Sequence, residues 1–246
     1  MIRKTNQTRI AYDFIRNAIF RGELKPGTTI SEEWLGNHLN ISRTPVREAL
    51  IRLQADGLIT VVNNRASVTP ITPVDIQEIY ELRLLLEPYA ARVCIGLIDK
   101  GEVRRVRDFT RRLLDETVGG PNGRGRHVTA AEAEGPDIPH RGRTPGKRDE
   151  ERDRHVHDIH ELIIGSTRNQ RLLTITRTLQ GQINLLLNAA ERIPGRIVQS
   201  MEEHLCLIDA ILADDPVKAE EHMRTHIRTN MNDMLNPANF RFIFKE

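Results

Sequence analysis

Hydrophobic positions near the start of the chain follow the spacing of amphipathic helices. Apolar residues at 10, 14, 15, 18 and 19 predict a first helix over residues 8–21, closed by Pro26-Gly27. Ser31 is well placed to cap a second helix, because a serine hydroxyl can accept a hydrogen bond from the first turn. In that helix Trp34, Leu35 and Leu39 are expected to face inward. The pattern therefore begins with two packed helices.

A third helix is predicted to begin at a cap formed by Ser42 or Thr44 and to end at Gly57. Its apolar stripe recurs at helical spacing over Val46, Ala49, Leu50 and Leu53. Two β-rich runs, LITVV and ASVTP, then flank residues 63–65 and predict a short hairpin. Three helices followed by a hairpin predict a winged helix-turn-helix domain over residues 1–72.

From residue 73 onward the hydrophobic spacing is helical almost throughout, and it predicts an all-α helical bundle over residues 73–246. Expected helices cover residues 73–98, with a bend at Pro88, then 101–117, 153–167, 169–191, 197–213 and 216–235. Residues 118–148 instead hold seven of the 16 glycines and four of the 12 prolines. Such a segment buries too little apolar surface to offset its ordering entropy, so we expect a mobile loop reaching to about residue 150. The predicted fold is mostly α.

Charge and cysteine content narrow the class of protein. Ten Lys or Arg oppose six acids among residues 1–70, although the whole chain carries a net charge of only +2. A basic first third is typical of a DNA-binding module joined to another domain. Cys94 and Cys206 lie too far apart for a disulfide framework, and both are expected to be buried. The chain has no apolar signal core or membrane-spanning run, so a cytoplasmic protein with no membrane partner is expected.

Two arginines of the third helix are candidates for reading DNA. Arg43 and Arg47 lie one turn apart, on the face opposite the apolar stripe, so both guanidinium groups are free to enter a groove together. A guanidinium fork matches the O6 and N7 acceptors of guanine, while Ser42 and Thr44 suit phosphate oxygens. Alternatively both arginines are merely solvated, with Arg47 paired to Glu48 or to a neighbouring helix.

The wording of this helix, SRTPVREALIRLQADGLI, resembles the signature helix of the GntR family of bacterial regulators. Three later pieces, EIYELRLLLEPYAARV, IHELIIGSTRNQRL and EEHLCLIDAILADDPVKAEEHMRTHI, resemble the FCD ligand-binding domain of its FadR subfamily. The resemblance implies that Asn64 and Arg65, at the hairpin tip, approach the minor groove. The glycine that usually follows the basic residue of the wing is missing from NNRAS.

The same resemblance implies a divalent metal, zinc or nickel, bound by three histidines and one aspartate. The matching positions are His160, His204 and His226, but Val156 stands where the aspartate is usual. Asp153 or His157 could replace it, because both share the helical face of His160. Alternatively, these histidines are ordinary surface or hydrogen-bonded core residues. A pair formed by His226 and His222, one turn apart, is a further possibility.

Arg83 opens the FCD-like segment, where it could pair with a carboxylate effector or, equally, with Glu87 one turn away. The resulting hypothesis is a homodimeric transcriptional regulator, a repressor rather than an enzyme, that binds double-stranded operator DNA and senses a small organic acid near a metal. Two rival hypotheses are a metallo-hydrolase built on the three histidines and an architectural DNA-binding protein whose second domain only dimerises.

Overall fold

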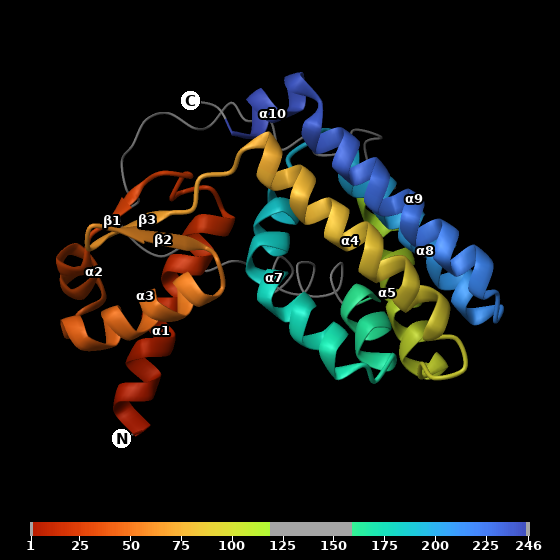
Figure 1. Cartoon of the computed structure of the whole chain (residues 1–246), viewed down its shortest axis with the longest axis horizontal. Coiled ribbons are helices and arrows are strands. Elements are labelled where there is room, and N and C mark those ends of the chain that lie inside the picture. The colour runs from red at the N-terminus through yellow and green to blue at the C-terminus, as the bar shows by residue number, and fades with distance from the viewer. Residues whose placement is uncertain (1, 119–158, 245–246) are drawn as a thin grey trace. The chain divides into compact units, whose positions relative to one another are not determined.

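A computed structural model describes residues 2–118 and 159–244 of the chain. Contacts divide it into two compact units, one comprising Met1–Ile79, Thr174–Arg192 and Asp233–Glu246, the other Tyr80–Leu173 and Ile193–Asn232. The fold is mostly α, as predicted, with a small sheet near the N-terminus (Figure 1). The domain boundary between residues 72 and 73 stays a prediction.

The N-terminal elements form a winged helix-turn-helix. In chain order they are α1 (Ile2–Phe20), β1 (Thr29–Ile30), α2 (Glu32–Leu39), α3 (Arg43–Ala55), β2 (Ile59–Val62) and β3 (Arg65–Val68). The sheet is antiparallel with strand order β1-β3-β2, and β3 pairs Ser67 with Thr29 on one side and with Thr60 on the other. The three helices and the hairpin are confirmed, whereas the two-residue strand β1 was not predicted.

The turn of the hairpin is formed by the two asparagines that precede Arg65. Asn63 and Asn64 both have positive φ angles, 50° and 60°. Val62 and Arg65 pair directly across the turn. A two-residue loop with left-handed backbone at both positions is a type I′ turn, whose twist matches that of the flanking strands. Asparagine tolerates this conformation better than most residues do, so the turn forms without a glycine, and Ala66, where the wing glycine is usual, pairs with Val61 in the sheet.

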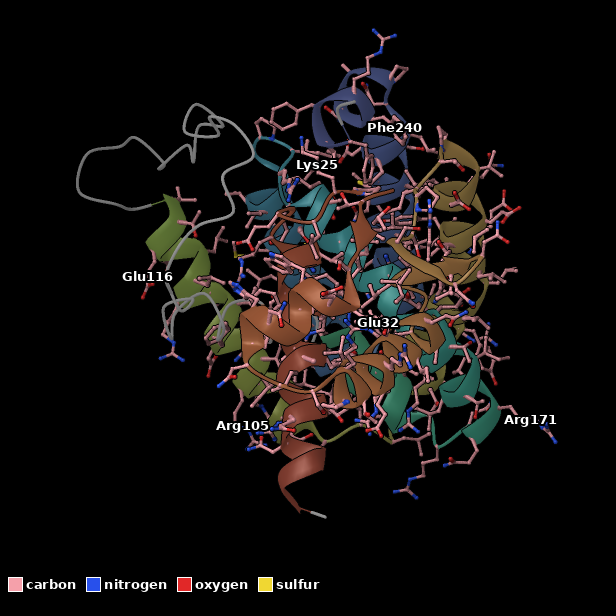
Figure 2. All side chains as sticks on the ribbon, turned by 90° about the vertical axis from the view of Figure 1, so that its left-hand side faces the viewer. Lys25, Glu32, Arg105, Glu116, Arg171 and Phe240 are labelled. Atoms are coloured by element: carbon pink, nitrogen blue, oxygen red, sulfur yellow. The ribbon has the colours of Figure 1, made fainter. Side chains whose placement is uncertain are left out.

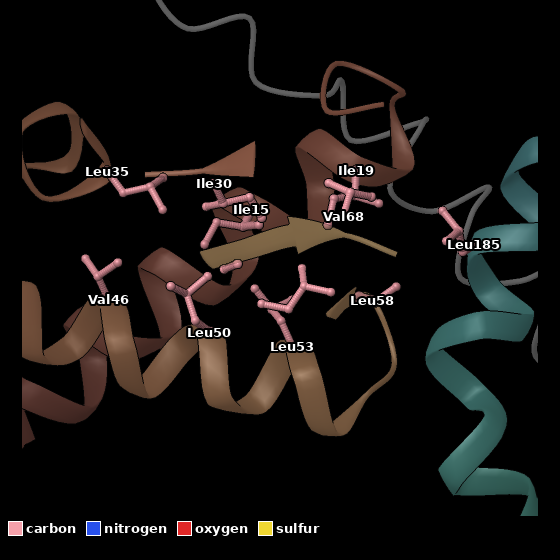
Figure 3. Packing of buried hydrophobic residues seen from close by; sticks show 12 residues of the cluster. Ile15, Ile19, Ile30, Leu35, Val46, Leu50, Leu53, Leu58, Val68 and Leu185 are labelled. Atoms are coloured by element: carbon pink, nitrogen blue, oxygen red, sulfur yellow. The ribbon is translucent and has the colours of Figure 1, made fainter. Parts of the chain in front are cut away.

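The apolar stripe of α3 lies in the core of the winged domain (Figure 3). Val46 and Leu53 are completely buried, and they pack with Ile15 of α1 and Val68 of β3. Burial of this stripe fixes which face of α3 is turned away from the core. Gly57, with a φ of 72°, ends the segment in the left-handed conformation that follows many helices.

The N-cap of α2 is as predicted, but one residue that was predicted to face inward is exposed. The Ser31 hydroxyl accepts a hydrogen bond from the Trp34 backbone N–H at 3.2 Å. Leu35 is buried, but the Trp34 side chain is 38% exposed and stacks on His38. The expectation that Trp34 faces inward is therefore wrong, because an aromatic neighbour at the surface covers one face of its ring.

The second half of the chain is helical, as predicted. Its elements are α4 (Pro73–Val93), α5 (Lys100–Val118), a helical stretch over 159–166, α7 (Gln170–Ala190), α8 (Arg196–Leu212), α9 (Pro216–Leu235) and α10 (Pro237–Ile243). The helix predicted over 73–98 ends earlier, at Val93, and α10 was not predicted. Val118 ends α5, and the rest of the loop predicted over 118–150 lies outside the described residues.

Two further predictions concern burial and membranes. Cys94 is buried as expected, but Cys206 is exposed, because it lies on the outer face of α8, opposite its buried residues. Among the residues that the structure describes, no helix combines the length and the hydropathy that crossing a bilayer requires.

Candidate functional site

The exposed face of α3 presents the two arginines singled out by the sequence. Their side chains are 62% exposed at Arg43 and 64% exposed at Arg47. Arg47 Nε lies 2.7 Å from Glu32 Oε2, and Arg43 Nη2 lies 3.3 Å from Glu33 Oε2. Glu32 is labelled in Figure 2. The expected alternative, a pairing of Arg47 with a neighbouring helix, is therefore present, and the partner is α2 rather than Glu48.

These ion pairs leave both arginines able to bind another negatively charged group. Exposed pairs of this kind stabilise a protein by only about 0–1 kcal/mol, so a more concentrated negative charge can replace the two glutamates. Both glutamates lie in the first turn of α2, so the ion pairs hold the two guanidiniums beside that turn. Pairing therefore orders the side chains without burying them.

The remaining candidates for DNA contact also lie at the surface. Ser42 occupies the N-cap position of α3 in extended backbone, but its hydroxyl makes no capping hydrogen bond. Ser42 and Thr44 are both exposed, as are Asn64 and Arg65 at the hairpin tip. The helix N-terminus and the wing tip thus each present polar groups, whose contacts with DNA stay a prediction.

In the second unit, three histidines from separate helical segments meet. His160 comes from the helical stretch 159–166, His204 from α8 and His226 from α9. His160 Nε2 lies 3.1 Å from His204 Nε2, which lies 3.3 Å from His226 Nε2. His204 and His226 are buried, and His160 is nearly so. Burial in this cluster makes a role as solvated surface residues untenable for all three.

The nitrogen spacing fits a metal ion. An ion bound to two imidazole nitrogens at about 2.05 Å separates them by about 2.9 Å at a right angle and about 3.3 Å at a tetrahedral angle. The two observed separations, 3.1 and 3.3 Å, lie within this range. Two of the three pairs thus have the spacing of metal ligands, and all three ligand atoms lie within 4.8 Å of one another.

Carboxylates fix the orientation of two of the rings. His160 Nδ1 lies 2.5 Å from Glu87 Oε2, and His226 Nδ1 lies 2.7 Å from Glu203 Oε2. An ionised carboxylate can only accept, so each Nδ1 is the protonated donor, and in the neutral rings each Nε2 keeps a lone pair. His204 Nε2 can donate a proton to at most one of its two neighbours. At least one close nitrogen contact therefore lacks a hydrogen bond, and a cation at the centre would relieve it.

Electrostatics around the cluster favour a neutral imidazole at His226 and an ionised carboxylate at Glu87. Burial, reinforced by the charges of His160 and the nearby arginines, holds the pKa of His226 well below its usual value. Burial alone would raise the pKa of Glu87, but the charge of Arg83 and the contact with His160 outweigh it and hold that pKa well below normal. Neutral imidazole is the form that ligates metals.

Both halves of the chain match known protein families. Residues 7–68 match the family described as bacterial regulatory proteins, gntR family, and residues 140–229 match the FCD domain. The HTH-type transcriptional regulator BphR of Paraburkholderia xenovorans is 30% identical over 224 residues, which cover 89% of this chain and 81% of BphR. The chain belongs to the GntR family.

Other matches to this GntR-family chain are more local or concern the fold. The gluconate operon transcriptional repressor of Bacillus subtilis is 40% identical over 81 residues, 33% of each chain. The chain spans 42%, 63% and 63% of the length of three further relatives. The solved structure of E. coli McbR/YncC has the same fold, with a TM-score of 0.67 at 18% identity, over 93% of this chain and 96% of that one. BphR and the gluconate operon protein are both named as transcriptional regulators.

Among the remaining sites predicted for this GntR-family chain, the structure describes Arg83 but not the residues around position 156. Arg83 is 2% exposed and pairs with Glu87, its Nε lying 2.6 Å from Oε1, so the expected ion pair is present. Arg83 Nη1 is nevertheless buried with no hydrogen-bond partner among the described residues, and a role toward an effector stays a prediction. Asp153, His157 and Val156 lie outside the described residues.

Two residues of the site were missed by sequence reasoning. Glu203 precedes His204 directly, yet it contacts His226 and Arg196 instead, at 2.7 and 2.8 Å. Glu87 was considered only as a partner of Arg83, and its second oxygen reaches His160. Neighbouring positions in a helix point about 100° apart, so only the packing of α8 against other helices could reveal these contacts. His222 is not part of the cluster.

Proposed function

We propose that this GntR-family chain is a sequence-specific DNA-binding transcriptional regulator, whose operator affinity is controlled by a small organic acid bound near a metal in the helical domain. The observation that carries the proposal is the face of α3, which presents Arg43 and Arg47 one turn apart and exposed. A bidentate contact from arginine to guanine discriminates between bases by roughly 1–3 kcal/mol.

Contacts to the backbone of the duplex would come from groups around these arginines. Ser42 and Thr44 are exposed at the N-terminus of α3, where free N–H groups attract phosphate. Asn64 and Arg65 at the wing tip would enter the adjacent minor groove. As a homodimer, the protein would read two half-sites about one helical turn apart. The name of the gluconate operon repressor supports a repressor over an activator.

The histidine cluster supports the sensing half of the proposal. His160, His204 and His226 would hold a divalent ion, zinc or nickel, which supplies positive charge for a carboxylate ligand. Arg83, whose Nη1 is buried and has no hydrogen-bond partner among the described residues, would contribute a second positive charge. A ligand bound there would stabilise one of two conformations and so change the affinity for the operator.

The proposal is tested by selecting duplexes from a random library with the full chain and comparing variants on the selected site. Arg47→Ala should reduce the preference for that site over random duplex by roughly 5- to 100-fold while leaving thermal unfolding unchanged. Arg105→Ala is the matched control, because Arg105 is 72% exposed and is likewise paired with a glutamate, Glu102, but lies on α5 (Figure 2). Unchanged preference in Arg47→Ala would contradict the proposed reading face.

The sensing half is tested separately by thermal unfolding of the protein with small carboxylates, before and after treatment with a chelator. A stabilisation that requires both metal and carboxylate is the expected result. If none of the carboxylates stabilises the metal-bound protein, the proposed class of effector is contradicted.

A further inference from the structure

The outer face of α4 carries large apolar side chains that no described residue covers. Leu82, Leu85 and Tyr89 are 40%, 71% and 49% exposed. Their spacing places them on one side of the helix, within about 60° of Leu85. The opposite side of the same helix is buried, with Ile76, Tyr80 and Arg83 all at 2% exposure or less. Large apolar side chains that are exposed side by side mark a candidate contact surface.

Charged residues extend this face in both directions, and their signs differ. Glu78 and Glu81 lie on the N-terminal side of Leu85, and Arg92 lies on the C-terminal side. All three are exposed and share the face of Leu85 within about 40°. Along the helix the face is thus acidic, then apolar, then aromatic and basic, over about 21 Å at about 1.5 Å per residue.

This order of charges suits a second copy of the same helix in one orientation. An antiparallel pair with a two-fold axis at Leu85 places Glu78 opposite Arg92 of the second copy, and Glu81 opposite Tyr89. Both arrangements occur twice by symmetry, and a two-fold contact of this kind is self-complementary. A parallel pair would place Glu78 against Glu78 and Arg92 against Arg92, which is unfavourable.

We propose that the face formed by Glu78, Glu81, Leu85, Tyr89 and Arg92, with Leu82 at its edge, is the surface through which two copies of this chain associate, as an antiparallel pair of α4 helices. The proposal specifies the surface of the homodimer assumed in the proposed function. Within one copy, Arg92 Nη1 lies 3.5 Å from Glu220 Oε2. Because 59% of the Arg92 side chain is exposed, it can also reach an acid of a second copy.

The experiment measures mass and dimer dissociation constant for the full chain by sedimentation over a range of concentrations, without DNA. The unmodified protein should be a dimer. Leu85→Glu, which sets two carboxylates against each other at the axis, should raise the dissociation constant on the order of 30-fold or more. Val217→Glu is the matched control, because Val217 is similarly exposed, at 70%, but lies on α9; it should leave the constant unchanged.

Charge exchange tests the orientation. Glu78→Arg and Arg92→Glu should each weaken the dimer by about tenfold, and the double exchange should restore it to within about threefold of the unmodified protein. A monomeric unmodified chain, or a Leu85→Glu variant that still dimerises normally, would overturn the proposed surface. A double exchange weaker than either single variant would overturn the antiparallel arrangement. Since DNA is absent, a failure here is distinct from a failure of DNA recognition.

Discussion

Replacing Glu203 by glutamine tests whether the carboxylates around the histidine cluster tune a metal site. Glu203 accepts from His226 Nδ1 at 2.7 Å, and its side chain is only 16% exposed. A hydrogen bond to a charged group contributes about 1.5–3 kcal/mol, against about 1 kcal/mol for a neutral one. Glu203→Gln preserves the shape but removes the charge, so metal binding should weaken by about 1–2 kcal/mol, or roughly 5- to 30-fold.

The assay is competition for zinc or nickel between the protein and a coloured chelator at neutral pH. Glu220→Gln is the matched control, because Glu220 also pairs with arginines, Arg92 and Arg224, but contacts no histidine of the cluster. Thermal unfolding of both variants checks that each is folded. A folded Glu203→Gln variant with the affinity of the unmodified protein would refute the assigned role of Glu203. Failure of the unmodified protein to bind either ion would refute the metal site itself.

The remaining predictions concern stability. Because burial holds the pKa of His226 below its usual value, the unfolded chain binds a proton below about pH 6.5 that the folded chain does not. The free energy of unfolding of chelator-treated protein should therefore fall as pH decreases from about 6.5, by at most about 1.4 kcal/mol per pH unit, and denaturant titrations should find this slope reduced in His226→Asn. An equal slope in both proteins would rule His226 out as its source. In the wing, Asn64→Val should lower the free energy of unfolding by about 1–2 kcal/mol because φ is 60° there, whereas Asn64→Gly should be nearly neutral; equal losses would count against the turn assignment.

Much of the fold followed from periodicity, and the failures have physical causes. The stripe from Val46 to Leu53 repeats over two turns, which is enough to define a helix and its buried face. Strand β1 has only two residues, too few for an alternating pattern, and owes its pairing to β3. Trp34 and Ile10 are apolar yet 38% and 45% exposed, because hydrophobic character alone does not determine burial.

The candidate site was predictable only in part. Resemblance located His160, His204 and His226, and packing brings them together. The carboxylates that orient two of these rings come from α4 and α8, so their roles depend on how separate helices meet. Likewise, the sequence indicated that Arg43 and Arg47 point outward, but their acidic partners on α2 depend on the angle between two helices.

The most direct test of the whole account is the ratio of two affinities, for a selected duplex and for random duplex, measured with the full chain at about 0.15 M salt. A regulator that reads bases through α3 should prefer the selected duplex by at least about 1,000-fold, and the ratio should change when metal and an effective carboxylate are added. Equal affinity for both duplexes, with or without metal and carboxylate, would contradict the account.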